Sequence, residues 1–291
     1  MLLHPKTPPW LRTPLTRQLS SIPLQADRHG VRTIILFLLG KQQDPSISQL
    51  DHIGKVIGSI PTWITAEEYI QRIAVQVIEL LDEKDVLLQR AAAHIITQLM
   101  TKHEAFVARY IFDLIQEPLL PRPSDSMMND VVFEDTAVEI CLNRLEKITL
   151  NPAPPLVISL LQPILPNLFL FLAYTQTAPQ SLLKSKILNL IQTYLTVSPT
   201  PPKDVLSLME RMLYVPPDWT FGPGGHGGVA VRRIATAETL DLNSIQSRIE
   251  SLLEILEKTP ENTKSEIFVG IVRKWLSPQD EMDPMQYIPV L

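Results

Sequence analysis

The chain has 291 residues, of which 45% are hydrophobic and 20% charged, a composition typical of a folded protein with a sizeable core. Its 31 acidic and 26 basic residues leave a formal net charge of −5. This charge argues against non-specific nucleic-acid binding, which needs a basic face. The 26 prolines and 10 glycines favour helices separated by sharp stops over a glycine-turned β-barrel.

The first 23 residues contain five prolines and are predicted to form an extended leader. They lack a basic segment followed by a long apolar run, so no signal peptide is expected and the predicted location is cytosolic or nuclear. From Leu24 onward the pattern is helical. Asp44-Pro45 predicts the start of one helix, with Asp44 as its N-cap and Pro45 at the first helical position.

The clearest helix follows Thr65-Ala66-Glu67-Glu68, which has the pattern of a capping box. Apolar residues then recur every three or four positions, as on one face of a helix. Gln71, Arg72, Gln76 and Glu79 are expected mostly on the other faces. The predicted buried stripe contains Ile70, Ile73, Ala74, Val77, Ile78 and Leu81.

Similar stripes predict helices over most of the remaining chain. The next three contain Leu88, Ala91, Ala92, Ile95, Ile96 and Leu99; then Val107, Tyr110, Ile111, Leu114 and Ile115; then residues 138–148. Further helices are predicted near 179–197, 202–213 and 245–256, and a last one, capped by Thr259-Pro260, with Phe268, Ile271, Val272 and Trp275 as its stripe. No window shows sustained alternation with period two, so the predicted fold class is all-α.

The segment Leu156–Tyr174 is a candidate membrane span because it contains 19 residues without a charge. Gln162, Pro163, Pro166 and Asn167 interrupt its middle, and broken backbone hydrogen bonds are costly in lipid. We therefore expect two short buried helices that meet at Pro163–Pro166, with a membrane span as the less favoured alternative.

Successive helix pairs return at about 40 residues, the period of HEAT and armadillo arrays. An Asp85 cap and the small residues Ala91, Ala92 and Ala93 after Arg90 fit this layout, because alanines let paired helices approach closely. The sequence thus favours a HEAT/armadillo-like helical-repeat solenoid over a closed bundle. The predicted organisation is a leader (1–23), a helical array (24–215), a Gly/Pro-rich loop (216–236), a continuing helical pair (237–277) and an extended tail (278–291).

No catalytic, cofactor-binding or metal-binding residue is predicted. Cys141 lies in an apolar stripe and is interpreted as a buried structural thiol. The six histidines, His4, His29, His52, His94, His103 and His226, show no metal-ligand spacing.

Residues 222–228, Gly-Pro-Gly-Gly-His-Gly-Gly, lack the Gly-Lys-Ser/Thr of a phosphate-binding loop and the serine elbow that accompanies an oxyanion loop. We interpret this segment as a flexible linker, with a binding loop as the alternative, and expect Trp219 and Phe221 just before it to anchor its start to the helices. The acidic residues Asp130, Glu134, Asp135 and Glu139 are interpreted as a solvated helix start, or alternatively as a docking patch for a basic partner.

Three segments resemble the transport and Golgi organisation protein six family, which includes the fungal factor required for nuclear transport of RNA polymerase II. They are Arg28–Phe37, Glu67–Leu81 and the turn Gly227-Gly228-Val229. The resemblance covers about residues 20–275 and corresponds to the middle helical region of that family. It implies an armadillo-like scaffold without catalytic residues or cofactors.

By this resemblance, the predicted function is non-enzymatic protein binding in the cytoplasmic assembly and nuclear import of RNA polymerase II. Its subunits and import or assembly factors are the expected partners, in the cytoplasm with shuttling to the nucleus. The alternative is a membrane-associated factor of the secretory pathway and Golgi organisation. Direct nucleic-acid binding is not expected. Arg72, Arg90, Arg109 and Tyr110 are candidate contact residues whose orientation the sequence leaves open.

Overall fold

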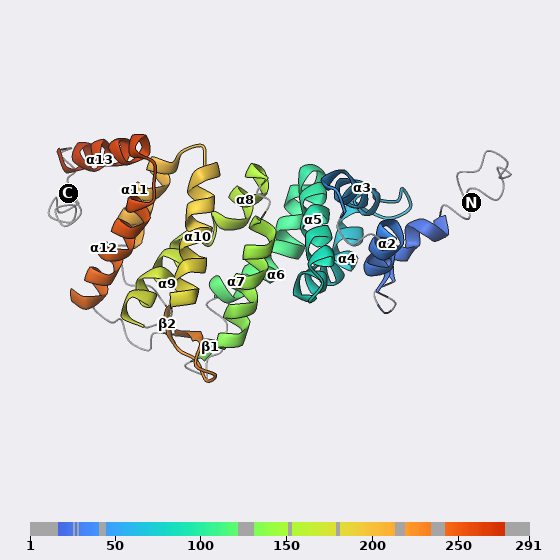
Figure 1. Ribbon diagram of the computed structural model, residues 1–291, viewed down its shortest axis with the longest axis horizontal. Helices are drawn as coiled ribbons and strands as arrows, with labels where there is room; N and C mark the ends of the chain where they lie inside the picture. The colour runs from blue at the N-terminus through green and yellow to red at the C-terminus, as the bar shows by residue number, and fades with distance from the viewer. Residues whose placement is uncertain are drawn as a thin grey trace. The chain divides into compact units, whose positions relative to one another are not determined.

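The computed structural model describes residues 17–25, 27, 29–40, 45–121, 131–150, 153–178, 181–212, 219–233 and 242–276. The chain forms two compact units, Met1–Ile115 and Gln116–Leu291, whose residues contact one another mainly within each unit. Figure 1 labels their helices and strands, and each unit is described by itself. The tail 278–291, most of the leader, the proposed cap Asp44, and the ends of the Gly/Pro-rich loop and of the last helical pair lie outside the described residues. Within the leader, residues 17–21 are helical and Ile22–Leu24 form a 3-10 turn, so the extended prediction is wrong there.

Unit 1 is built from α2 (Gly30–Leu39), α3 (Ile47–Ile57), α4 (Ala66–Asp82) and α5 (Val86–Val107). The helix α5 packs along both α3 and α4, and α2 contacts α3 and α4. The helix α3 begins at Ile47 after its N-cap Ser46, which forms a capping box with Gln49, so the helix start predicted at Pro45 is two residues early. These contacts bury the apolar faces of successive helices against one another.

The helix α4 confirms the predicted register. All six residues of its predicted stripe are buried, and the Thr65 hydroxyl accepts a hydrogen bond from the Glu68 amide (3.2 Å). Gln76 differs from the expectation because it is also buried, at 5% exposure. Its side chain accepts from the Val31 amide (3.1 Å) and donates to the Pro23 carbonyl (2.8 Å), and so joins α4 to the start of α2.

The helix α5 confirms the close pairing expected from its alanines. Asp85 accepts a hydrogen bond from the Leu87 amide (2.9 Å), and Ala91 and Ala92 are fully buried. The backbone of His103 is non-helical (φ −139°, ψ 46°), so the helix is kinked there. A π-helical turn, η3 (Ala108–Phe112), and α6 (Asp113–Gln116) follow, where the stripe predicted a separate regular helix.

Unit 2 contains the remaining elements. They are η4 (Glu117–Leu119), β1 (Val131–Phe133), α7 (Asp135–Thr149), α8 (Pro154–Leu161), α9 (Leu165–Thr177), α10 (Ser181–Val197), α11 (Pro201–Met212), β2 (Trp219–Pro223), β3 (Val229–Arg233), α12 (Leu242–Glu257) and α13 (Glu261–Leu276). The helix α10 packs on α7, α8 and α9, while α12 packs on α9 and α13 on α11 (Figure 1). The central helix is α9, whose residues Leu168–Ala173 are all buried.

The segment predicted as two short buried helices is confirmed as α8 and α9, which meet at a bend of 69°. Gln162 and Pro163 are exposed in the bend, and the Gln162 amide donates to the Ile158 carbonyl (2.9 Å) at the end of α8. Among the described residues, no single helix has the length and hydropathy to cross a membrane; α8 and α9 satisfy both criteria only as a bent pair.

A small three-stranded antiparallel sheet, in the order β1-β3-β2, departs from the all-helical expectation. The strands β2 and β3 form a hairpin across the segment that was predicted to be a flexible linker, so that prediction is wrong for residues 219–233. Its strands have three to five residues, too few to produce a detectable period-two pattern.

The end of unit 2 corrects two further expectations. The Thr259 hydroxyl donates to the Ile255 carbonyl (2.8 Å), so it closes α12 and does not cap α13. Ile267 and Ile271 are buried, whereas Phe268 is 54% exposed, so the predicted stripe of α13 is only partly correct. The side chain of Trp275 lies outside the described residues.

Candidate functional site

One exposed stripe runs along α4, opposite its buried face. Glu68, Arg72, Val75 and Glu79 recur at helical spacing, and all four are exposed. The sequence can predict this stripe, because positions that alternate with the buried apolar residues at the same helical spacing lie on the opposite face of α4. Three of the four residues are charged, and Val75 is 54% exposed between them.

Ion pairs and hydrogen bonds connect this stripe to the neighbouring segments. Glu67 accepts from the Tyr110 hydroxyl (2.6 Å) and the Arg109 guanidinium (3.4 Å), and that guanidinium lies 5.3 Å from the centre of the Tyr110 ring. At the other end of α4, Glu83 pairs with Arg32 of α2 (3.5 Å). We call the combined region the α4 surface: Glu67, Glu68, Arg72, Val75, Glu79 and Glu83 with Arg32, Arg109 and Tyr110.

The charges on the α4 surface are neutralised mainly by exposed pairs. Arg72 pairs with Glu68 one turn away, and the six paired side chains are between 38% and 68% exposed. The hydrogen bond to Glu67 raises the pKa of Tyr110 above its ordinary value of 10. Exposed pairs of this kind contribute about 0–1 kcal/mol each, so a partner can replace them at little cost.

The structure thus brings together three of the four candidate contact residues, Arg72, Arg109 and Tyr110. The fourth, Arg90, is half-buried in α5. Sequence reasoning did not single out Arg32 or Val75 as surface residues. A shallow depression lined by His29, Arg32, Gln76, Glu79, Leu80 and Glu83 adjoins the α4 surface.

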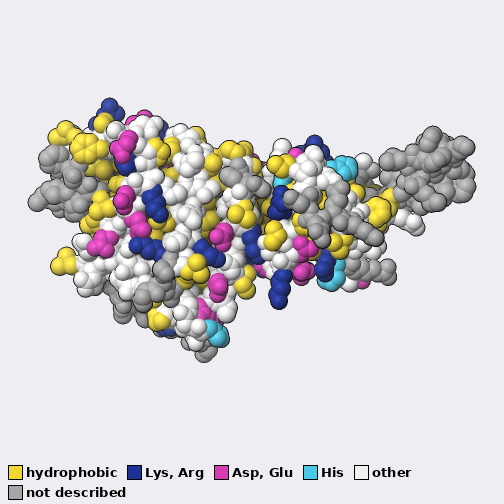
Figure 2. All heavy atoms as spheres, in the orientation of Figure 1, with side chains coloured by type: hydrophobic (Ala, Val, Ile, Leu, Met, Phe, Trp, Pro, Cys, Tyr) yellow, Lys and Arg dark blue, Asp and Glu magenta, His cyan; other side chains and the backbone are white. Residues whose placement is uncertain are grey.

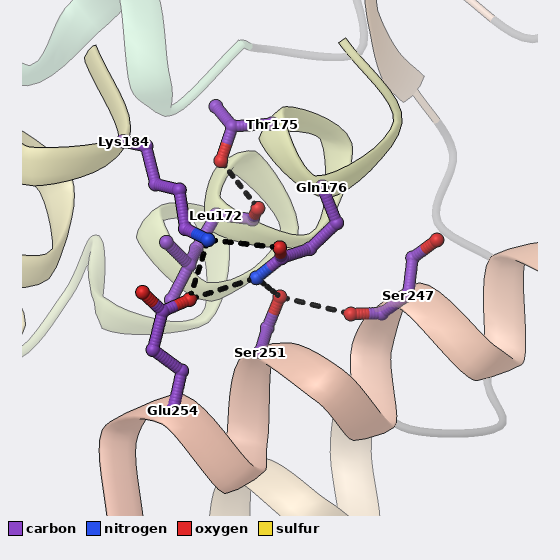
Figure 3. Close-up of polar contacts among 7 residues, drawn as sticks. All are labelled: Leu172, Thr175, Gln176, Lys184, Ser247, Ser251 and Glu254. Carbon is purple, nitrogen blue, oxygen red and sulfur yellow. Dashed lines mark hydrogen bonds and ion pairs between the residues drawn. The ribbon is translucent and has the colours of Figure 1, made fainter. Parts of the chain in front are cut away.

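In unit 2, a polar cluster holds α12 against α9 and α10 (Figure 3). The Gln176 amide donates to Glu254 (2.9 Å) and Ser251 (3.2 Å) and accepts from Lys184 (3.0 Å), which also pairs with Glu254 (2.9 Å). Burial raises the pKa of Glu254, but the hydrogen bonds from Lys184 and Gln176 and the charges of Lys184 and Lys258 outweigh it, and the net pKa is lowered. This cluster joins helices and has the features of a structural contact.

The hairpin is attached to α9 by aromatic packing. Phe221 stacks on Phe171, with ring centres 4.3 Å apart, and Trp219 meets Phe221 edge-on at 5.2 Å. The prediction that aromatic residues anchor this segment to the helices is confirmed for Phe221, on which Trp219 packs. The glycine-rich turn therefore has a defined position in unit 2.

The acidic residues near the start of α7 have separate environments. Glu134 and Glu139 are exposed, whereas Asp135 is buried and hydrogen-bonds to His226 of the hairpin turn. The interpretation as a solvated helix start is therefore wrong for Asp135. Asp130 lies outside the described residues.

Cys141 is buried, and burial raises the pKa of its thiol to about 12, which confirms the interpretation as a structural residue. Within the described ranges, no three His, Cys, Asp or Glu side chains converge in a way that could hold a metal. His226 bonds to Asp135 and His94 to Asp51 (3.1 Å), while His4 lies outside those ranges.

On the face shown in Figure 2, acidic and basic side chains are interspersed with apolar ones. The stacked amphipathic helices place the chain among helical-repeat proteins of the armadillo-like class. Members of this class are scaffolds of a non-catalytic type. The family model described as "Transport and Golgi organization protein 6 homolog, ARM-like repeat" matches residues 26–262, and the chain belongs to this family. No curated protein matches the sequence.

Proposed function

We propose that the protein is a non-enzymatic scaffold that binds another protein through the α4 surface. The observation that carries this proposal is the exposed stripe of α4, where the apolar Val75 lies among charged side chains and the ion pairs are exposed to solvent. A partner can bury Val75 and exchange the pairs of Arg72 and Arg109 for its own carboxylates. The interspersed charges favour a protein partner over a nucleic acid, which would require a basic face.

We further propose a role in the cytoplasmic assembly and nuclear import of RNA polymerase II. Family membership and the resemblance at Arg28–Phe37 and Glu67–Leu81 support this role. The second segment belongs to α4, so the resembling residues supply both the buried stripe and part of the α4 surface. The proposed partners are polymerase subunits and import or assembly factors, and the proposed location is cytoplasmic with shuttling to the nucleus.

Pull-down of polymerase subunits and import factors by the full chain tests both proposals. We expect Val75→Glu to reduce capture of the partner at least about tenfold, because it places a charge in the centre of a desolvated contact. The matched control is Val56→Glu on α3, since Val56 is 40% exposed but lies outside the α4 surface. Equal capture by the two variants would exclude the α4 surface, and no enrichment over an unrelated helical-repeat protein would exclude the polymerase role.

A role in Golgi organisation is the second candidate, and two observations favour it. They are the description of the family and the joint hydropathy of α8 and α9. Against membrane insertion, the apolar side chains of both helices already form part of the core of unit 2. Vesicle flotation followed by carbonate extraction separates the two candidates: retention in the membrane fraction after extraction would favour the Golgi role, and full release would favour the scaffold without a membrane-inserted segment.

A further inference from the structure

The carboxylate of Asp135 is the meeting point of four hydrogen-bond donors from two distant parts of unit 2. Its Oδ2 accepts from the backbone amides of His226 and Gly228, both at 2.9 Å. Its Oδ1 accepts from the Thr136 amide (3.0 Å) and from Nδ1 of His226 (3.0 Å). The Asp135 side chain is only 4% exposed, so these donors replace the water that a carboxylate would otherwise bind.

The hairpin turn is shaped to close over this carboxylate. A Cβ atom placed on Gly224 would lie 2.4 Å from the Asp135 Cβ, and one placed on Gly228 would lie 2.8 Å from it. Both positions therefore require glycine for the approach. The Gly224 amide also donates to the Gly228 carbonyl (2.9 Å), which closes the turn itself.

Two other attachments, one through strand pairing and one through aromatic stacking, hold the rest of the hairpin. The strand β3 pairs with β1, with Phe133 opposite Val231, and Phe221 stacks on Phe171 of α9. The contact at Asp135 is different because it contains an ionisable partner that reaches solvent: the His226 side chain is 74% exposed. Acidic and histidine side chains accordingly lie together at the hairpin turn (Figure 2).

From this geometry we propose that Asp135 and His226 form a proton-sensitive clasp that fastens the inserted hairpin to the start of α7. When the imidazole is protonated, Nδ1–H donates to Asp135 with full charge on both groups. When the imidazole is neutral, the backbone donors of His226 and Gly228 remain, but the ionic contribution is lost. The clasp is independent of the proposed partner surface, which lies in unit 1.

The charged groups that face His226 favour its protonated form, as the proposal requires. The hydrogen bond and the charge of Asp135, with a smaller contribution from the nearby charge of Glu134, raise the pKa of His226 above its ordinary value of 6.5. The hydrogen bond from His226, followed by those from the Gly228, His226 and Thr136 amides, lowers the pKa of Asp135 to about 2. The ionic contribution is therefore complete below pH 6.5, is lost as pH rises through the raised pKa of His226, and is lost again only when strong acid protonates Asp135.

Hydrogen exchange of the full chain, followed by mass spectrometry and corrected for the intrinsic pH dependence of exchange, tests the clasp. In the unaltered protein we expect opening of the 219–233 hairpin to increase about two- to fivefold between about pH 6 and about pH 8, the size of effect expected of an ion pair whose histidine is screened by solvent. His226→Gln should remove this pH dependence. Because the imidazole is largely exposed, this variant should fold normally.

Two further variants make the result specific. Asp135→Asn should increase opening of the hairpin at least about tenfold at both pH values, because the amide presents donors to the donors of the turn. Glu139→Gln, an exposed change on the same helix, should behave like the unaltered protein. Peptides from α4 and α5 in unit 1 should exchange at the same rate in all four proteins.

An NMR titration of the imidazole provides an independent measurement. The His226 pKa should lie above 6.5 in the unaltered protein and fall toward its ordinary value in Asp135→Asn. An ordinary pKa in the unaltered protein, or the same pH-dependent opening of the hairpin in His226→Gln, would overturn the proposal. Unchanged hairpin exchange in a folded Asp135→Asn would also overturn it, because the strand pairing and the aromatic stacking would then suffice to hold the hairpin.

Discussion

Replacing Gln76 with methionine tests the contact that joins α4 to the start of α2. The two side chains have similar volumes, so the change removes hydrogen bonds without opening a large cavity. The Val31 amide would lose its acceptor at 3.1 Å, and the Pro23 carbonyl its donor at 2.8 Å, and both Val31 and Pro23 are buried. Each buried group left without a partner costs about 1–3 kcal/mol, so we expect unit 1 to lose a few kcal/mol of stability.

Because the chain has two units, the measurement must report on unit 1 itself. Hydrogen exchange of α2 peptides, measured at increasing urea concentrations, reports the unfolding of unit 1. Gln71→Met is the matched control, since Gln71 lies on the exposed face of the same helix and should change stability by less than about 0.5 kcal/mol. If the two variants unfold at the same urea concentration, the buried position assigned to Gln76 is wrong.

Three other predictions concern the core, the α12 contact and the thiol. Ile78→Asp should destabilise unit 1 by several kcal/mol in urea unfolding, because it buries an unpaired carboxylate, whereas Gln71→Asp should have little effect; equal losses would refute the assigned faces of α4. Since the pKa of Glu254 is lowered below 4.5, its contribution to holding α12 is complete above pH 4.5 and should be lost as the pH falls through the lowered pKa; exchange of α12 peptides should rise over that range, and Lys184→Ala should weaken this acid dependence. Cys141 should resist thiol reagents at about pH 8 and react fully in denaturant, and rapid labelling of the native protein would contradict its burial.

Most of the helices could be predicted from the sequence because the signal for each is local. In α4, apolar residues three and four positions apart must share one face of a helix, whatever the helix packs against. The Thr65 and Asp85 caps are equally local, since each side chain bonds an amide two or three residues away. The outward stripe with Arg72 and Val75 follows from the same period.

Other features depend on partners that local patterns do not contain. Gln76 is polar, yet it is buried because its partners, 45 and 53 residues away in the sequence, need a donor and an acceptor at that place. Asp135 likewise resembled a solvated helix start until His226 and Gly228, more than 90 residues later, were placed beside it. In α13, apolar residues occupy several faces, so only packing on α11 could decide that Ile267 and Ile271 face inward.

The sequence by itself therefore determined the helical class, the register of the strongly amphipathic helices and their caps, because these follow from spacings within about one or two turns. The tertiary structure alone decided that the glycine-rich segment is a hairpin and that an aspartate at the start of α7 holds it. Strands of three to five residues carry too little periodicity to be recognised, and a hydrogen bond between residues 91 positions apart exists only after the chain between them has folded.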